Sequence, residues 1–325
     1  MIKLKNKFAI GCLVQWYEIE VINEYIESVK QSLETIDNKK NVIVDICVNL
    51  SQELEKVKDD ISLGDIANRF YILEKSLRNK GYVVNVDYKL EGIYTIADYR
   101  RDFNTKYCHI TDVLMWGETD ALIPKQTFEI IDNLHESVHH QTPKYVATFG
   151  ICKMWDESWK PVEHTDFTDK PFIEDDYDNW WSLKYTMSLE EMYKINDKVG
   201  ELDVTVLNNF KFNGCGLIFS SEIVKCGVNI PESVFFVHED TAFQNFMISL
   251  YGNTIPQYVI KNVLIVHNRN HPDKRMYIKD EREDGTMNEK RRSNEWYVKA
   301  NKMSEHNAYN FMNQQKMFTW EDVYE

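Results

Sequence analysis

The chain contains few of the residues that break or cross-link a fold. It has 7 prolines, 12 glycines and 6 cysteines among 325 residues, and no two cysteines form a CxxC pair. Because Cys12, Cys47 and Cys215 lie in apolar or glycine-flanked runs, we expect reduced core thiols. The sequence also shows no signal peptide and no apolar run long enough to span a membrane. We therefore expect a cytoplasmic protein, in the host cytoplasm if the source is viral rather than bacterial.

Basic residues are scarce relative to acidic ones. The chain has 38 Lys and Arg against 52 Asp and Glu, a net charge of -14. A protein that holds nucleic acid mainly by its charge needs clustered Lys and Arg, so this class is disfavoured. Two late basic clusters, 274–275 and 290–292, are best interpreted as solvated surface, although a local basic groove stays open. Apolar residues, at 43%, are numerous enough for a sizeable core.

Apolar runs and helical patterns alternate along the first half of the chain. Strands are expected at 8–14, 41–48, 82–88 and 110–116, and helices at 19–33, 63–79, 96–107 and 124–140. This alternation predicts an α/β fold with a doubly wound, mostly parallel sheet flanked by helices.

The second half is less regular. We expect strands at 145–152, 212–219 and 259–267, a long loop over 154–179, and helices at 188–199 and 239–250. Ser188 and Glu191 have the spacing of a capping box. We expect a main domain over 1–272, with a donor half to about 123 and an acceptor half from about 124, and a charged, mainly helical C-terminal extension over 273–325.

An acidic triplet, Glu118-Thr119-Asp120, follows the fourth predicted strand and Gly117. In a doubly wound sheet the ligand binds at the carboxyl ends of the strands. The triplet should therefore share a crevice with residues 14–18 and Asn49, which follow the first two strands. Carboxylates there can hold a divalent cation that bridges two phosphates. The position of the triplet favours a ligand site over a solvated turn.

This order of motifs resembles glycosyltransferases with the GT-A fold, especially family 2, over roughly residues 7–272. The first strand and loop, 8–18, match the start of that family, and Tyr99-Arg100-Arg101-Asp102 matches its Arg-bearing helix. Glu118-Thr119-Asp120 corresponds to the family's Asp-x-Asp metal motif, with Glu in place of the first Asp. The acid that usually recognises the nucleobase has no clear counterpart, so the resemblance does not identify the base.

The second half contains three further matches. Gly214 and Gly216 lie in a stretch similar to the small-residue strand before the acceptor site. Glu239-Asp240, preceded by apolar residues, is similar to the family's Glu-Asp motif at a helix N-terminus. His267 ends the last predicted strand, where metal-dependent members often have a histidine ligand.

The resemblance implies a metal-dependent, inverting enzyme that transfers one hexose or pentose. Mn²⁺ or Mg²⁺ would be held by Asp120, Glu118 and His267. Asp240 would act as the base and Glu239 would bind the acceptor. The donor would be a nucleoside-diphosphate sugar, by family habit a UDP-sugar, framed by Val14, Gln15, Trp16, Glu18, Asn49, Arg100, Arg101, Gly117 and Thr119. The acceptor would be a glycan or lipopolysaccharide, contacted by Gly214, Gly216, Trp180 and Trp181.

Other hypotheses stay open on the sequence alone. A phage-type enzyme could glycosylate a hydroxymethylated base in DNA. His135-Glu136-Ser137-Val138-His139 matches the HExxH pattern of zinc proteases, although Pro143 soon ends its helix and no third ligand stands at the expected spacing. A non-catalytic protein that binds sugar nucleotides is the remaining alternative.

Overall fold

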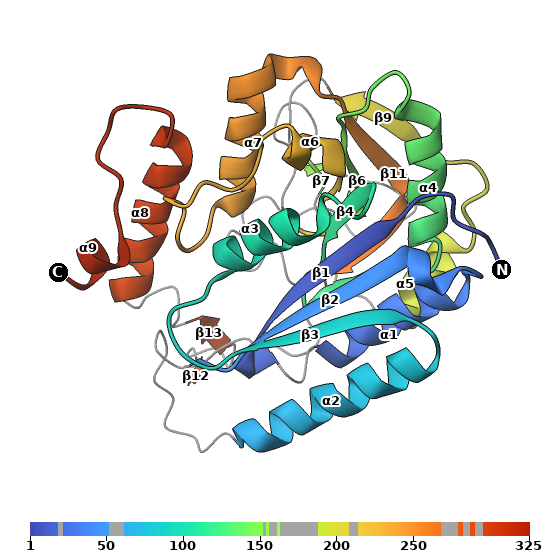
Figure 1. Cartoon of the computed structure of the whole chain (residues 1–325), viewed down its shortest axis with the longest axis horizontal. Helices are drawn as coiled ribbons and strands as arrows, with labels where there is room; N and C mark the ends of the chain where they lie inside the picture. The colour runs from blue at the N-terminus through green and yellow to red at the C-terminus, as the bar shows by residue number, and fades with distance from the viewer. Residues whose placement is uncertain are drawn as a thin grey trace.

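The computed structural model describes residues 1–18, 22–51, 62–151, 154–155, 161–162, 188–207, 214–267, 279–281, 287–289 and 295–325. A central sheet has helices on both faces, and further helices form the C-terminal part (Figure 1). Its strands run mostly parallel in the first half of the chain. The predicted α/β class is therefore confirmed.

The first half alternates strand and helix as predicted. Its elements are β1 Phe8–Gln15, α1 Ile22–Glu34, β2 Val42–Asn49, α2 Leu63–Asn79, β3 Val83–Lys89, α3 Ile96–Tyr107 and β4 Val113–Trp116, with a short 3-10 helix, Trp16–Glu18, after β1. The four strands lie parallel in the order β3-β2-β1-β4. The fourth strand begins later than predicted, because the amides of Ile110 and Thr111 still donate to Tyr107 O at the end of α3.

The side chains of β1 alternate between two cores, as a strand covered on both faces requires. Phe8, Ile10, Cys12 and Val14 pack with apolar residues of α1, of α2 and of the later helix α4, Thr127–Val138. Ala9 and Leu13 pack on the opposite face with residues of α3 and of the later helix α7, Glu239–Tyr251. Figure 1 shows α3 and α7 on one side of the sheet and α1 and α2 on the other. Strand β1 is thus the centre of the first half.

The second half completes the sheet with strands of both directions. Its elements are β5 Ala121–Leu122, α4 Thr127–Val138, β6 Val146–Ile151, β7 Met154–Trp155, β8 Pro161–Val162, α5 Leu189–Asn196, β9 Val204–Leu207, β10 Ile218–Ser220, α6 Ser221–Lys225, α7 Glu239–Tyr251 and β11 Gln257–His267. The order continues β4-β10-β6-β11-β5, with β9 also on β11. Strand β10 runs antiparallel to both neighbours. The predicted capping box at Ser188 and Glu191 is confirmed.

The expected strand over 212–219 is wrong in its extent. Only Ile218–Ser220 is a strand, and the described residues before it, from Gly214, form a bend and a turn. Gly216 has a φ of 64°, a left-handed conformation that favours glycine and ends extended pairing. A Cβ at Gly216 would also lie 2.4 Å from Ile265 Cδ1. Glycine therefore shapes a turn here, not a strand.

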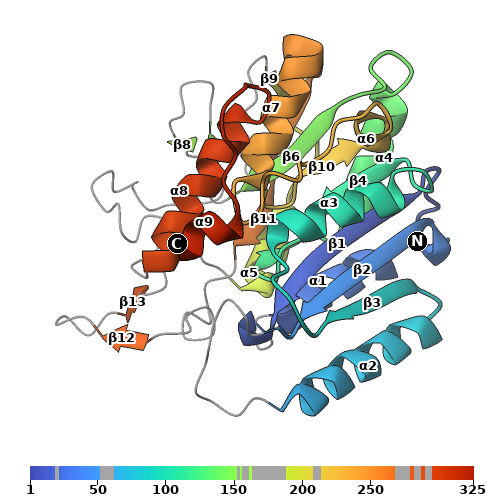
Figure 2. The same ribbon diagram turned by 60° about the vertical axis from the view of Figure 1, so that its left-hand side comes forward.

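The C-terminal part is largely helical, as predicted. It contains a short hairpin, β12 Lys279–Glu281 and β13 Met287–Glu289, and the helices α8 Glu295–Asn310 and α9 Trp320–Tyr324. Helix α8 lies beside α7, as Figures 1 and 2 both show. Phe235 and Phe236 pack with Ala300 and Val323 in a separate small core. The division at 272 and 273 stays a prediction.

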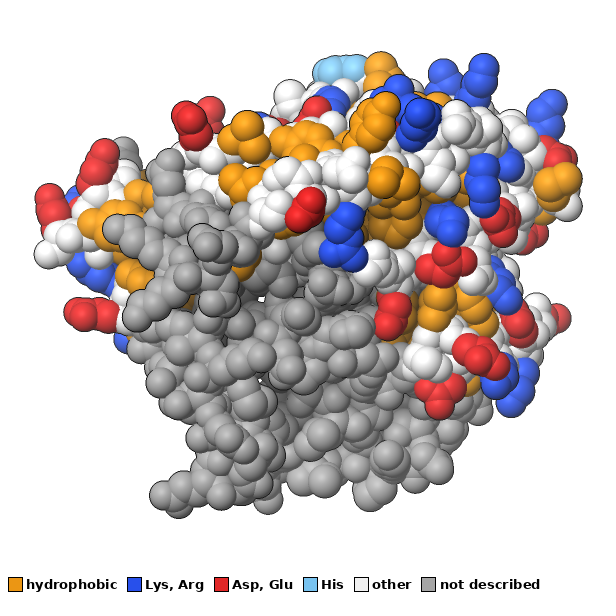
Figure 3. Space-filling model, turned by 90° about the horizontal axis from the view of Figure 1, so that it is seen from below, with side chains coloured by type: hydrophobic (Ala, Val, Ile, Leu, Met, Phe, Trp, Pro, Cys, Tyr) orange, Lys and Arg blue, Asp and Glu red, His pale blue; other side chains and the backbone are white. Residues whose placement is uncertain are grey.

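The described surface carries mixed charge on the face that Figure 3 shows, where Lys and Arg side chains lie among Asp and Glu side chains. Within the described residues, no helix is both long enough and apolar enough to cross a membrane.

Candidate active site at the ends of β1 and β4

The switch point of the sheet lies between β1 and β4. From β1 the chain proceeds outward to β2 and β3, and then returns to the other side of β1 as β4. At such a point the loops after the two central strands diverge and leave room for a ligand. The residues after β1 and after β4 are Trp16–Glu18 and Gly117–Asp120. The structure thus brings the predicted triplet and the predicted first loop to one place.

Gly117 lets the two strand ends meet closely. Its amide donates to Gly11 O at 2.6 Å. A Cβ at Gly117 would lie 2.1 Å from Tyr25 Oη and 2.9 Å from Gly11 O. A side chain is therefore excluded at this position, and the acidic triplet starts directly against β1.

Arg100 of α3 joins three segments that are far apart in sequence. Its guanidinium donates to Glu118 Oε1 at 2.6 Å, to the carbonyl of Gly214 at 3.0 Å and to the carboxylate of Glu239. The guanidinium also lies over the indole of Trp116, 4.6 Å from the ring centroid. A Cβ at Gly214 would lie 2.1 Å from Arg100 Nη1. Glycine at 214 and arginine at 100 therefore fit each other.

The Arg100 network is buried and charged. Arg100 is 2% exposed and Glu239 is 6% exposed. Burial opposes the charge of Arg100, but Glu239 and Glu118 outweigh it and raise the pKa of Arg100. For Glu239, burial raises the pKa of the carboxyl group, Arg100 opposes this effect and Asp240 adds to it. Removal of either partner would leave the other as an uncompensated buried charge.

This network changes the role expected for Arg100. We predicted a donor-binding arginine, but its guanidinium already bonds two carboxylates and a carbonyl inside the protein. A phosphate would have to displace those partners. Arg100 holds Glu118 and Glu239 together, and donor binding by Arg100 stays a prediction.

Asp240 lies beside Glu239 in the first turn of α7. Its Oδ2 accepts a hydrogen bond from Gly214 N at 2.9 Å, and its Oδ1 accepts from Thr241 N at 2.7 Å. The side chain is half-buried. The structure therefore joins the predicted catalytic pair to Gly214, a predicted acceptor residue.

Acidic side chains gather around the end of β1. Burial raises the pKa of the Cys12 thiol, and the charges of Glu18, Glu118 and Asp120 raise it further. These carboxylates come from both diverging loops and act on one buried atom of β1. The charge of Arg100 acts in the opposite direction on the same thiol, so carboxylates and a guanidinium surround this part of β1.

His267 meets the triplet through the sheet. In the pairing of β11 with β5, His267 is the register partner of Ala121, which follows Asp120 directly. The side chain of His267 lies outside what the structure describes. The backbone therefore brings the predicted histidine next to the predicted carboxylate, and ligation stays a prediction.

The resemblance implies a metal ion held by Asp120, Glu118 and His267. Mg²⁺ and Mn²⁺ prefer carboxylate oxygens, and Mn²⁺ also accepts imidazole. Asp120 has such oxygens by residue type, and Glu118 Oε1 accepts a hydrogen bond from Arg100. Among the residues described here, no three His, Cys, Asp or Glu side chains form a ready cluster. Asp120 and His267 fit the ion by residue type, and Glu118 is at most a partial ligand.

The other predicted donor residues occupy several environments. The side chain of Val14 is in the core, and Trp16 and Thr119 are also buried. Glu18 accepts from the amide of Gln15 at 3.1 Å, which closes the loop after β1. Asn49 donates to Gln15 Oε1 at 3.0 Å. Gln15, Glu18 and Asn49 thus lie together, while Val14 offers only its backbone.

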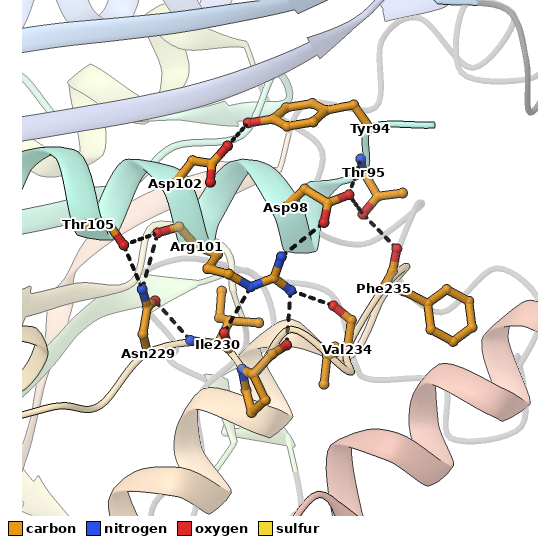
Figure 4. A network of polar contacts seen from close by, with 11 residues as sticks. Tyr94, Thr95, Asp98, Arg101, Asp102, Thr105, Asn229, Ile230, Val234 and Phe235 are labelled. Carbon is orange, nitrogen blue, oxygen red and sulfur yellow. Dashed lines mark hydrogen bonds and ion pairs between the residues drawn. The ribbon is translucent and has the colours of Figure 1, made fainter. Parts of the chain in front are cut away.

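Arg101 faces away from the acidic cluster. Its guanidinium donates to the carbonyls of Ile230, Pro231 and Val234 at 2.7 to 2.9 Å, and to Asp98 (Figure 4). These contacts fasten α3 to the segment that leads into α7. Its observed partners therefore give Arg101 a structural role, although we expected donor binding.

The HExxH segment forms part of the scaffold. His135 is buried, and its Nδ1 lies 2.9 Å from Tyr145 Oη. The rings of His135 and His139 are stacked, with centroids 4.6 Å apart. Glu136 bonds Lys5 and Asn6 near the start of the chain. Each side chain thus has a structural partner, which disfavours a zinc protease site.

Four further residues bear on the site, two of them predicted from the sequence and two not. Trp180 and Trp181 lie outside the described residues. Sequence reasoning missed Trp116, which lies under the guanidinium of Arg100, although its place just before Gly117 was a signal. It also missed His238, the left-handed residue before Glu239, for which the sequence offers no signal.

No protein-family profile matches the chain, and no curated protein matches its sequence. Among solved structures it is similar to S. aureus TarS 1–349 in complex with UDP-GlcNAc, with 14% identity over 80% of this chain and 57% of that chain, at a TM-score of 0.43. The chain thus spans little more than half of that structure. A second structure of S. aureus TarS 1–349 has 14% identity over 94% of this chain and 73% of that chain, at a TM-score of 0.44. The structure of UDP-glucose pyrophosphorylase complexed with UDP-glucose has 10% identity over 78% of this chain and 90% of that chain, at a TM-score of 0.37.

Proposed function

We propose that the chain is a metal-dependent, inverting glycosyltransferase. It would move one sugar from a nucleoside-diphosphate sugar, in the first place a UDP-sugar, to a hydroxyl group of a glycan or lipopolysaccharide. One observation carries this proposal. Arg100 bonds both Glu118 of the acidic triplet and Glu239 of the acidic pair, which brings the two motifs together at the switch point. This proximity supports a site in which a diphosphate would bind beside a catalytic base.

The donor half would use the residues after β1, β2 and β4. Gln15, Glu18 and Asn49 would frame the nucleotide. Asp120 and His267 would hold Mn²⁺ or Mg²⁺, which when bound neutralises the diphosphate leaving group. The closed contact between Gly117 and Gly11 keeps the triplet fixed against β1.

Asp240 would be the catalytic base. Its carboxylate takes the proton of the acceptor hydroxyl while that oxygen attacks the anomeric carbon. The bond from the sugar to the diphosphate breaks, and the configuration at the carbon inverts. The hydrogen bond from Gly214 N orients one oxygen of Asp240, and Glu239 is held beside it by Arg100. In this role Glu239 is a positioning residue unless an acceptor reaches it.

The test is Asp240→Asn. General-base catalysis contributes roughly 10²- to 10⁴-fold, so sugar transfer and UDP release from a UDP-sugar should fall by that factor. Binding of UDP, measured by calorimetry, should be unchanged. UDP-GlcNAc and UDP-glucose are the first donors to try. Glu232→Gln, an exposed acid in the preceding segment, is the matched control. Wild-type transfer in Asp240→Asn would show that the base is another residue.

The charge of the chain favours a glycan acceptor over DNA. A net charge of -14 disfavours binding of DNA by charge, and on the face that Figure 3 shows, the described basic side chains lie among acidic ones. A gel shift at low salt with hydroxymethylated DNA checks this choice. A retained band that weakens steeply with salt would make DNA the acceptor instead.

A further inference from the structure

The turn before the acidic pair has an unfavourable backbone conformation. His238 has a φ of 67° and a ψ of 23°, and within the described residues it alone has a positive φ without being glycine. Residues that carry a Cβ adopt this left-handed backbone conformation only at an energetic cost. Such a conformation persists only where the surroundings over-determine it. His238 directly precedes Glu239 and Asp240, so its backbone sets the direction in which α7 begins.

Helix α3 holds one side of the segment that leads to this turn. Arg101 bonds the carbonyls of Ile230, Pro231 and Val234, and Thr95 Oγ1 donates to Phe235 O at 2.9 Å (Figure 4). These bonds end at residue 235. They leave residues 236–238, where the chain turns into α7, to other partners.

Helix α8 supplies those partners. Ser304 Oγ donates to Val237 O at 2.5 Å and accepts from Val237 N at 3.3 Å. Asn301 Oδ1 lies 2.6 Å from His238 Nε2, so the imidazole donates to it. Asn301 and Ser304 are three residues apart and therefore lie on one face of the helix. Ser304 is fully buried. Both backbone groups of Val237 and the side chain of His238 are thus held by α8.

Apolar packing fixes α8 in place. Phe236 packs against Trp296, Tyr297 and Trp320 of the C-terminal helices, with ring centroids 5.3 to 5.9 Å apart. Buried Asn307 donates to Ser233 O at 2.6 Å and to Phe318 O at 2.8 Å. The C-terminal helices are therefore docked on the segment 233–238 as a packed unit.

We propose that α8 is a positioning element of the active site, and that Asn301 and Ser304 are positioning residues for Asp240. By holding Val237 and His238, they keep the left-handed turn in place. The turn starts α7 so that Glu239 reaches Arg100 and Asp240 reaches Gly214 N. The catalytic consequence rests on the proposed function, whereas the structural consequence does not.

Hydrogen exchange on the intact protein tests the structural consequence. In Asn301→Ala and in Ser304→Ala, amides 236–244 should exchange faster than in wild type, while those of β1 should not change. Glu305→Ala changes an exposed neighbour on the same helix and should leave both regions as in wild type. Equal exchange at 236–244 in all four proteins would overturn the proposal.

Kinetics test the catalytic consequence. Because a small misplacement of a catalytic group lowers the rate steeply, kcat for UDP release from a UDP-sugar should fall about tenfold or more in both variants. The Kd for UDP should not change, since the donor residues lie on other elements. Faster exchange together with a wild-type kcat would overturn the positioning of Asp240.

Two substitutions of His238 separate the backbone from the imidazole. His238→Ala and His238→Gly both lose the bond to Asn301, but only alanine keeps a Cβ in the left-handed region. His238→Gly should therefore retain a kcat about tenfold above that of His238→Ala. Equal rates would contradict a role for the turn. If wild-type protein neither binds UDP nor releases it from a UDP-sugar, the proposed function fails, and the exchange experiment alone decides whether α8 holds the turn.

Discussion

Arg100 is the residue on which the site depends most. Arg100→Leu removes the cation from two carboxylates, one of them in Glu239, which is 6% exposed. Breaking a buried ion pair by deleting one partner costs about 3–5 kcal/mol of folding stability. We expect a loss of that size in urea unfolding at pH 7.

The cause of that loss can be separated by a second substitution. Arg100→Leu with Glu239→Gln leaves a neutral amide in place of the buried carboxylate, so part of the stability should return. The single variant Arg100→Leu should also gain stability relative to wild type as the pH falls. Burial raises the pKa of Glu239, and without Arg100 the main effect that opposes this shift is removed. The neutral carboxyl group therefore contributes folding stability at low pH, and this stability is lost as the pH rises through the folded pKa of Glu239. An unchanged loss in the double variant would contradict this explanation.

Gly214 provides a second test at the scale of one residue. In Gly214→Ala the new Cβ would lie 2.1 Å from Arg100 Nη1, so the guanidinium must move. Overpacking of this kind typically costs about 1–3 kcal/mol. Gly64→Ala is the control, because it lies in α2 with no atom within 4 Å of its Cβ. That substitution should stabilise the protein by about 0.5–1 kcal/mol, since alanine favours helix. Thermal unfolding of both variants measures the two changes in folding stability. A Gly214→Ala variant as stable as wild type would contradict the close packing of Arg100 against Gly214.

At the scale of elements, α4 makes stability depend on pH. Burial lowers the pKa of His135, and His139 lowers it further, against the opposing charges of Asp112, Glu136 and Asp132. A histidine with a lowered folded pKa contributes stability that is present above its unfolded pKa of 6.5. That stability is lost as the pH falls through the folded pKa. Urea unfolding should therefore show less stability at pH 5 than at pH 7.

The histidine responsible can be identified by comparison. His135→Gln keeps a polar group near Tyr145 but cannot titrate, so the decrease in stability between pH 7 and pH 5 should be smaller. His109→Gln changes an exposed histidine and should keep the wild-type decrease. If the two variants show the same decrease, His135 is not its source.

The elements themselves were largely predictable. The helices 63–79 and 96–107 were predicted at the bounds that the structure has. The long apolar strands β1, β2 and β11 were also found, because their patterns are strong and their ends have clear signals. The short strands β5 and β9 were missed, since two to four residues have no recognisable period. The sequence pattern predicts a strand over 212–219, because the left-handed conformation of Gly216 cannot be recognised from the residue type alone.

At the scale of the whole molecule, proximity of the motifs was predictable but their bonding was not. The carboxyl ends of parallel strands meet at one edge, so the triplet and the loop after β1 were expected together. Which arginine of Arg100-Arg101 faces the acids depends on the rotation of α3, and its pattern did not determine that. The docking of α8 on Val237 and His238 joins residues more than sixty positions apart through single polar bonds. No local pattern in the sequence encodes such bonds.

We propose above all that a diphosphate binds beside Asp120 together with a metal ion. The direct test is thermal unfolding with UDP, with Mn²⁺, and with both, in wild type and in Asp120→Asn. A ligand at 100 times its Kd stabilises the folded state by about 2.7 kcal/mol. We predict a stabilisation of that order in wild type only when UDP and Mn²⁺ are both present, and its loss in Asp120→Asn. Failure of UDP and Mn²⁺ to stabilise the wild type, or equal stabilisation of Asp120→Asn, would contradict the claim.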